Sequence, residues 1–366
     1  METKGNSDFA LTLLQWFREN GRDLPWRQTH DPYAIWLSEI SLQQTQVKQG
    51  WDYWERFMRR WPKVEDLAAA TEDEVLREWQ GLGYYSRARN LHFAAKQIVE
   101  MGGFPRTIEG LRSLKGVGDY TAAAIGSIAF GLPAAVVDGN VYRVLARYFG
   151  IDTPINTTEG KKTFATMAQE LLPSSGEESS PFVFPSSGEE GLGVEGISTA
   201  SSYNQAIMDF GAIQCTPASP SCSSCPLMES CEAFRKGRVS ELPIKLKTLK
   251  VRERRLTYIY IRWQGKVAIH RRGAGDIWQG LWEPFVQEAD QEMVLPGRLT
   301  ILKQAVRHVL THQVLLANFL LLEPDTQPSL PSDYLWVSEE ELDTYAVPRL
   351  VERLFEAVRL YDVPSV

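Results

Sequence analysis

All four cysteines of this 366-residue chain fall within 17 residues, which makes them a candidate metal centre. They are Cys215, Cys222, Cys225 and Cys231, in the spacing Cys-x6-Cys-x2-Cys-x5-Cys. Because no cysteine occurs elsewhere, the pattern is unlike a disulfide framework and fits a reducing compartment. Structural zinc usually takes two close cysteine pairs, whereas one close pair and two outlying cysteines suit the corners of a 4Fe–4S cluster better. The sequence therefore predicts a 4Fe–4S centre, with zinc as the alternative.

A second candidate site is the glycine hairpin Lys115, Gly116, Val117 and Gly118. Glycine permits positive φ and close approach of another backbone. The alanine-rich run 120–130 that follows reads as a helix, and the first amides of a helix are free to bind a phosphate. The pattern predicts an anion-binding turn.

Asp138 directly precedes a segment with helical periodicity, in which apolar residues stand at positions 141, 144, 145, 148 and 149. An aspartate in this place is expected to cap the helix. For an isolated aspartate, capping alone is the simpler interpretation. A catalytic role is the alternative, and the anion-binding hairpin about twenty residues upstream favours it.

Glu39 is the other candidate carboxylate. Asp31-Pro32 is a helix start signal, and the helix that follows carries an apolar stripe at positions 33, 37, 40, 44 and 47. Glu39 lies off this stripe, with Trp36 and Gln43 on the same face. Burial beside Trp36 should raise the pKa of the Glu39 carboxyl. The alternative is a solvated glutamate on an exposed helix face.

The composition indicates a globular chain of two domains. The formal net charge is −7, but residues 233–272 hold 13 Lys and Arg against 2 acids, so a phosphate-binding surface is possible locally. A solvated linker is the alternative for this run. Without a membrane-length apolar run or a signal-peptide core, we expect a soluble, cytoplasmic protein that is associated with the nucleoid if the source is prokaryotic.

The order of the elements separates an all-helical part from a mixed one. Helices are expected over 9–20, from 32, and over 51–60, 71–79, 85–101, 120–130, 139–149 and 203–210, with no strand before residue 150. Residues 173–202 repeat Pro-Ser-Ser-Gly-Glu-Glu and are expected to be a disordered or loosely held insertion. Strands at 256–263 and 267–271 are expected to be joined by the turn Gln264-Gly265. With a further strand at 314–322 and a helix at 348–360, they predict an α+β domain of roughly 110 residues.

These motifs, in this order, resemble the helix-hairpin-helix glycosylase superfamily from about residue 8 to 235. The cysteine spacing matches the 4Fe–4S loop that the endonuclease III family carries. The resemblance implies a mainly α glycosylase region over 1–232, with a six-helix barrel over about 32–133 and an iron–sulfur subdomain from 1–31 plus 134–232. A basic linker, 233–252, and an α+β Nudix-like domain, 253–366, follow.

Three further stretches, 24–27, 38–47 and 81–87, resemble the adenine DNA glycosylases of the MutY type. The resemblance implies that Glu39 protonates the departing adenine while Asp138 stabilises or transiently bonds the deoxyribose C1′. It places Asn140 beside Asp138. Tyr120 stands where strand-cutting relatives have a lysine that forms a Schiff base. The resemblance therefore implies a monofunctional enzyme, in which Tyr120 orients Asp138 or the attacking water.

The resemblance also implies the partner, double-stranded DNA with adenine opposite 8-oxoguanine or guanine, bound by a monomer. Base flipping would use Gln44, Leu82 and Tyr84 as a wedge. Asp209 would hydrogen-bond the adenine amino group, and the hairpin would hold the DNA backbone. The other residues expected at the substrate are Arg22, Trp26, Arg27 and Gln43.

The C-terminal part resembles the Nudix-like domain with which adenine glycosylases read 8-oxoguanine. The run of acids that a Nudix pyrophosphatase needs is missing, so that activity is not expected. The reading turn is Leu310-Thr311-His312, where many members have Phe-Ser-His, and leucine cannot stack as an aromatic ring does. Two rival functions stay open at this point: a glycosylase/lyase acting on damaged pyrimidines, and a DNA-damage binding protein without catalysis.

Overall fold

The computed structural model describes residues 2–173, 198–246, 251–288 and 296–363. The chain folds into two compact units, Met1–Val47 with Ala94–Lys247, and Lys48–Phe93 with Thr248–Val366. Most of the predicted insertion 173–202 and part of the predicted linker 233–252 lie outside the described residues. These units are a division by compactness, in which residues 48–93 group with the C-terminal part of the chain. The domain boundaries expected from the sequence stay a prediction.

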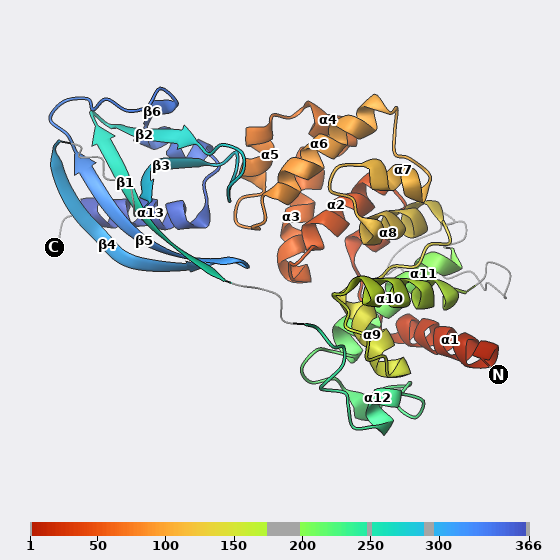
Figure 1. Cartoon of the computed structure of the whole chain (residues 1–366). Helices are drawn as coiled ribbons and strands as arrows, with labels where there is room; N and C mark the ends of the chain where they lie inside the picture. Colours follow the sequence, from red (N-terminus) through yellow and green to blue (C-terminus); the bar gives the residue numbers. More distant parts are fainter. Residues whose placement is uncertain (1, 174–197, 247–250, 289–295, 364–366) are drawn as a thin grey trace. The chain divides into compact units, whose positions relative to one another are not determined.

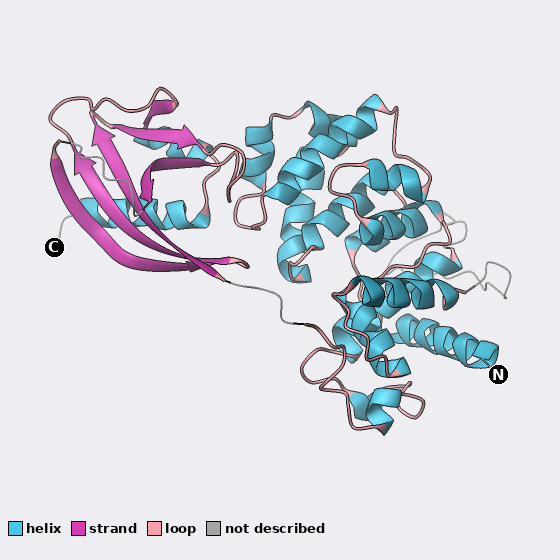
Figure 2. Cartoon of the chain, viewed as in Figure 1, coloured by secondary structure: helices cyan, strands magenta, loops and turns pink. Residues whose placement is uncertain are grey.

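The first unit is helical (Figure 1, Figure 2). Its elements are α1 (Glu2–Asn20), η1 (Pro25–Arg27), α2 (Pro32–Leu42), α7 (Ile108–Ser113), α8 (Asp119–Phe130), α9 (Gly139–Phe149), α10 (Thr158–Glu170), α11 (Thr199–Asp209), η2 (Phe210–Gln214), η3 (Cys222–Ser224) and α12 (Glu232–Arg235).

Helical periodicity builds the core of this unit. On α1 the buried residues Phe9, Leu13, Trp16 and Phe17 follow the three-and-four spacing of one helix face. They pack in one cluster with α9, α10 and α11, where Phe210 meets Trp16 edge to face at 4.9 Å between ring centroids. This cluster holds α9 and α11 in place, and both helices contribute to the site described below.

The second unit combines helices with a sheet. The helices are α3 (Val47–Arg60), α4 (Val64–Ala69), α5 (Glu72–Glu78), the first part of α6 (Ser86–Glu100), η4 (Glu339–Thr344) and α13 (Arg349–Asp362). The strands are β1 (Arg252–Trp263), β2 (Lys266–Arg271), β3 (Trp282–Glu288), β4 (Arg298–Val309), β5 (Gln313–Glu323) and β6 (Tyr334–Ser338), in the order β4-β5-β1-β3-β2-β6. The β1–β5 pair is parallel and the other pairs are antiparallel.

The predicted β1–β2 hairpin is confirmed. Its turn, Gln264-Gly265, has φ of 48° and 69°, the conformation that two-residue hairpins prefer. The apolar face of α13 covers the sheet, where Leu350, Leu354 and Phe355 are buried in the core cluster. None of the described helices is long and apolar enough to span a bilayer.

Candidate active site

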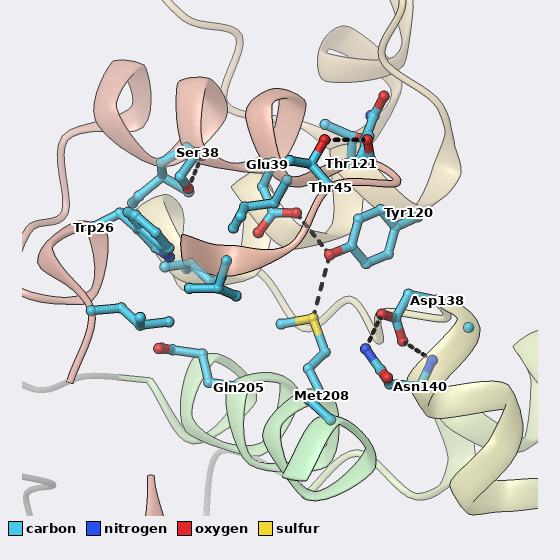
Figure 3. Close-up of a pocket in the computed structure, with 18 of the residues that line it drawn as sticks. Trp26, Ser38, Glu39, Thr45, Tyr120, Thr121, Asp138, Asn140, Gln205 and Met208 are labelled. Atoms are coloured by element: carbon cyan, nitrogen blue, oxygen red, sulfur yellow. Dashed lines mark hydrogen bonds between the residues drawn. The ribbon is translucent and has the colours of Figure 1, made fainter. Parts of the chain in front are cut away.

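Glu39 and Asp138 line one cavity of the first unit, with a volume of about 640 Å³ (Figure 3). The walls come from α2, α8, η1, the N-terminal end of α9 and α11. The two carboxylates are 99 residues apart in the chain (138 − 39) and are brought together because α2 packs on α8 and α9 packs on α11.

The helix α2 positions Glu39. It begins as predicted, because the Asp31 side chain accepts a hydrogen bond from the Tyr33 amide and Pro32 occupies the first turn. Nearly the whole helix is buried, including Trp36, so the predicted stripe is too narrow. Glu39 is the partly exposed residue that faces the cavity.

Burial raises the pKa of Glu39 to about 7, which confirms the direction predicted from the sequence. The hydrogen bond from Tyr120 and the charge of Arg27 act in the opposite direction, while the charge of Asp138 raises the pKa further. Glu39 is therefore divided between its neutral and charged forms near neutral pH, as a general acid requires.

Asp138 is the N-cap of α9, as predicted. Its Oδ1 accepts hydrogen bonds from the amides of Asn140 and Val141, and its Oδ2 accepts one from the Asn140 side-chain amide, each at 2.8 Å. Burial raises the pKa of Asp138, and these three donors oppose that shift because they stabilise the charged form. Asn140 therefore lies where the sequence placed it, in direct contact with Asp138.

Tyr120 contacts the carboxylate of Glu39. Its hydroxyl donates to Glu39 Oε2 at 2.7 Å and lies 3.4 Å from Met208 Sδ, while its expected role of orienting Asp138 or the attacking water stays a prediction. Burial, then the negative charges of Glu39 and Asp138, raise the pKa of Tyr120 well above its ordinary value. The phenol therefore stays protonated and acts as a donor.

Asp209 lies behind the cavity wall and does not line the cavity. Its Oδ1 accepts from Arg22 Nε at 2.9 Å and Arg27 Nη2 at 2.8 Å, and its Oδ2 accepts from the Arg22 amide and Arg27 Nη1. Burial alone would raise the pKa of Asp209, but the two guanidinium groups lower it. In this structure Asp209 therefore holds the two arginines, and its expected contact with the adenine amino group stays a prediction. Arg22, Arg27 and Trp26 do line the cavity.

The other predicted substrate residues are divided between the units. Gln43 and Gln44 line the cavity at the end of α2, where Gln44 has φ of 58° and Gln43 Nε2 lies 3.3 Å from Thr121 Oγ1. Leu82 and Tyr84 belong to the second unit, where Leu82 is buried and the exposed Tyr84 hydroxyl hydrogen-bonds Thr311 Oγ1 at 2.6 Å.

Within the reading turn, Leu310, Thr311 and His312 follow β4. Leu310 packs against the core of the sheet, while Thr311 and His312 are exposed. Leu310 is thus partly buried, and Thr311 is the residue of this turn that meets Tyr84.

The hairpin between α7 and α8 has the predicted form at one glycine. Gly116 has φ of 80°, and the Lys115 amide is held by Gln97 Oε1 at 2.8 Å. Gly118 is an extended N-cap with φ of −94°, so positive φ is not why glycine stands there. A Cβ at Gly118 would meet open space, which leaves the first amides of α8 accessible to an anion. Val117 is buried and anchors the turn.

The four cysteines line one small cavity. Four cysteine thiolates are the donor set of both a 4Fe–4S cluster and a structural zinc site, so the lining of this cavity fits either group. Arg147 Nη1 donates a hydrogen bond to Cys215 Sγ at 3.4 Å.

A chain of hydrogen bonds joins this loop to Asp138. Asn140 Nδ2 donates to Asp138, Arg143 Nη2 donates to Asn140 Oδ1 at 2.8 Å, and Arg143 Nε donates to the Cys215 carbonyl at 2.6 Å. Arg143 is buried, so its bonds are shielded from water. Met208 and Arg143 were not singled out from the sequence, because Tyr120 and Cys215, their partners here, lie 88 and 72 residues away in the chain.

Comparisons with known proteins define the class first. A family model described as "HhH-GPD superfamily base excision DNA repair protein" matches residues 37–170, and one described as "NUDIX domain" matches residues 257–357. The solved structure of a thermostable thymine-DNA glycosylase superimposes with a TM-score of 0.54 at 30% identity, covering 64% of this chain and 98% of that one.

Sequence relatives then give the family. An adenine DNA glycosylase of Buchnera aphidicola (Schizaphis graminum) is 32% identical over 277 residues, which cover 75% of this chain and 73% of the relative. The mouse adenine DNA glycosylase is 41% identical over 249 residues, covering 64% of this chain and 44% of the relative. The chain thus spans less than half the length of that mammalian relative. The chain belongs to the adenine DNA glycosylase family.

Proposed function

We propose that the chain is a monofunctional DNA glycosylase that hydrolyses the N-glycosidic bond of adenine opposite 8-oxoguanine or guanine. The observation that carries this proposal is the pair of carboxylates in one cavity with different environments. Glu39 accepts one hydrogen bond from a phenol, whereas Asp138 accepts three. Pairs of carboxyl groups in unequal environments divide the roles of acid and charge stabiliser in glycoside hydrolysis.

In this proposal an adenine nucleotide leaves the base stack, at a cost of a few kcal/mol, and enters the cavity. Neutral Glu39 gives its proton to a ring nitrogen of the base while the bond between the base and C1′ breaks. The carboxylate of Asp138 stabilises the sugar cation that forms. Water then adds to C1′ and gives a proton to the Glu39 carboxylate, which restores the neutral acid and completes hydrolysis without cutting the backbone.

The nature of the cavity wall supports a monofunctional enzyme. Tyr120 is the residue that reaches Glu39, and among the residues that line the cavity there is no lysine. A phenol with a raised pKa cannot form a Schiff base with the sugar aldehyde, which a strand-cutting enzyme requires.

Other parts of the chain would serve binding. The amides after Gly118 and the side chain of Lys115 would hold a DNA phosphate. The cysteine loop would hold a 4Fe–4S cluster, whose role would be structural. In the second unit, Thr311 and His312 are exposed and could reach an 8-oxoguanine, with Tyr84 beside them.

Incubation with defined duplexes tests the proposal. Duplexes with adenine opposite 8-oxoguanine, guanine or thymine would be treated with the protein, with and without alkali. We expect free adenine from the first two, and strand breaks only after alkali. Strand cleavage without alkali would favour a glycosylase/lyase. Binding without any adenine release would favour a damage-binding protein.

Metal content is tested separately. If the loop holds a 4Fe–4S cluster, elemental analysis should find iron and the protein should show a visible absorbance band. Zinc without iron would contradict the cofactor assignment and leave the glycosylase proposal standing.

A further inference from the structure

The hydroxyl of Tyr120 has two hydrogen-bond acceptors and one proton. Glu39 Oε2 lies 2.7 Å from Tyr120 Oη and Met208 Sδ lies 3.4 Å from it (Figure 3). A phenol donates one hydrogen bond and can also accept, whereas a thioether is a weak acceptor only. The two bonds therefore cannot both be made at full strength.

The charged groups around Tyr120 already have partners of their own, so Glu39 and Met208 are the acceptors considered for its hydroxyl. The charged groups near Glu39 and Tyr120 are Asp138 at the start of α9 and Arg27 on η1. Asp138 accepts from Asn140 and Val141, and Arg27 is paired with Asp209. Met208 comes from α11, opposite Glu39 on α2, and presents its sulfur between the helices.

We propose that Met208 is a positioning residue whose sulfur accepts the hydrogen bond of the Tyr120 hydroxyl while Glu39 is neutral. In the free protein the Glu39 O–H then donates to Tyr120 Oη, and the Tyr120 O–H donates to Met208 Sδ. When Glu39 has given its proton away, the Tyr120 O–H turns to Glu39 Oε2. No covalent bond other than the O–H bond of Glu39 changes in this exchange.

Two substitutions should therefore move the pKa of Glu39 in opposite directions. Met208→Leu removes the acceptor that supports the neutral arrangement, so the pKa should fall by about half a unit to one unit, the value of a modest hydrogen bond. Tyr120→Phe removes the donor that stabilises the carboxylate, so the pKa should rise. In a Tyr120→Phe background, Met208→Leu should have no further effect.

The experiment is a ¹³C NMR titration of the full chain labelled with ¹³C at the glutamate side-chain carboxyl. Loss of a signal in Glu39→Gln assigns the resonance. Met167→Leu is the matched control, since Met167 packs in the core of the same unit and does not line the cavity, and it should leave the pKa unchanged. Met208→Ile replaces Met208→Leu if the latter does not fold.

An unchanged pKa in the Met208 variant would overturn the proposal. An equal shift of the Glu39 pKa by Met208→Leu in the Tyr120→Phe background would also overturn it, because that result would show that Met208 acts through packing alone. Although the significance of the exchange rests on the proposed function, the titration needs no substrate. Adenine release from the A:8-oxoguanine duplex is measured in parallel. If the predicted NMR shifts were found without adenine release, the result would contradict the glycosylase proposal and leave the role of Met208 standing.

Discussion

Glu39 and Asp138 show how local structure gives the same chemical group two properties. Glu39 lies in the last turn of α2, where the backbone amides are already used within the helix, and the donor that reaches its carboxylate is a side chain. Asp138 lies before the first turn of α9, where free amides point at it. Burial raises the pKa of both, but only Asp138 receives amide donors that favour its charge. Position within a helix therefore decides which of the two carboxylates has amide donors that stabilise its charged form.

The most severe test of this comparison replaces each carboxylate by its amide. Glu39→Gln and Asp138→Asn should each lower the single-turnover rate of adenine release by about 1,000-fold or more, since they remove a general acid and a charge stabiliser. Duplex binding, measured by gel shift, should persist. Because Asn is also a good N-cap, Asp138→Asn should change the free energy of unfolding by less than about 1 kcal/mol. Near-normal adenine release by either variant would refute its assigned role.

Asp209 is a third buried carboxylate, and its negative charge is balanced by the arginines that pair with it. Asp209 is buried between Arg22 and Arg27, so Asp209→Asn should lower the free energy of unfolding by about 3 kcal/mol. Urea denaturation measures it. The control Asp152→Asn, at an exposed ion pair with Arg238, should leave the midpoint unchanged. An unaffected midpoint for Asp209→Asn would show that the arginines do not depend on this acid.

Stability at different pH values sharpens the contrast at Glu39. Its folded pKa is raised from 4.5 to about 7, so its stabilising effect is complete below pH 4.5 and is lost as the pH rises through 7. Between pH 5 and pH 8, the wild type should therefore lose stability relative to Glu39→Gln, on the order of 1 kcal/mol because the site is partly open to solvent. If the difference in the free energy of unfolding between the wild type and Glu39→Gln were the same at both pH values, the result would contradict the raised pKa of Glu39.

The smallest expected effect concerns an exposed acid at the hairpin. Asp119 is 83% exposed and pairs with Arg112 at 2.8 Å, next to the amides that we assign to a phosphate. Asp119→Asn should tighten binding of undamaged duplex by about threefold at low salt, and the gain should vanish at high salt. Fluorescence anisotropy at two salt concentrations would measure it, with Asp343→Asn, at an exposed ion pair with Arg359, as the control. Weaker binding at low salt would place the phosphate elsewhere.

The features that the sequence predicts well are local ones. The Asp31 and Asp138 caps, the Gly116 turn and the Gln264-Gly265 hairpin depend on neighbouring residues only. The pairing of Tyr120 with Glu39 and of Asp209 with the arginines depends on how distant helices pack, which no spacing reveals. The strand β4 escaped prediction for another reason. It is exposed along most of its length, and irregular pairing around Ala305, with φ of 50°, breaks the alternation.

The pH dependence of adenine release tests the account most directly. Single-turnover rates from the A:8-oxoguanine duplex would be measured with the wild-type chain between about pH 5 and pH 9, a range of roughly two units on either side of the Glu39 pKa. If neutral Glu39 is the acid, the rate should be level at low pH and fall about tenfold per unit above pH 7. A rate that stays constant up to pH 9 would contradict the role of Glu39.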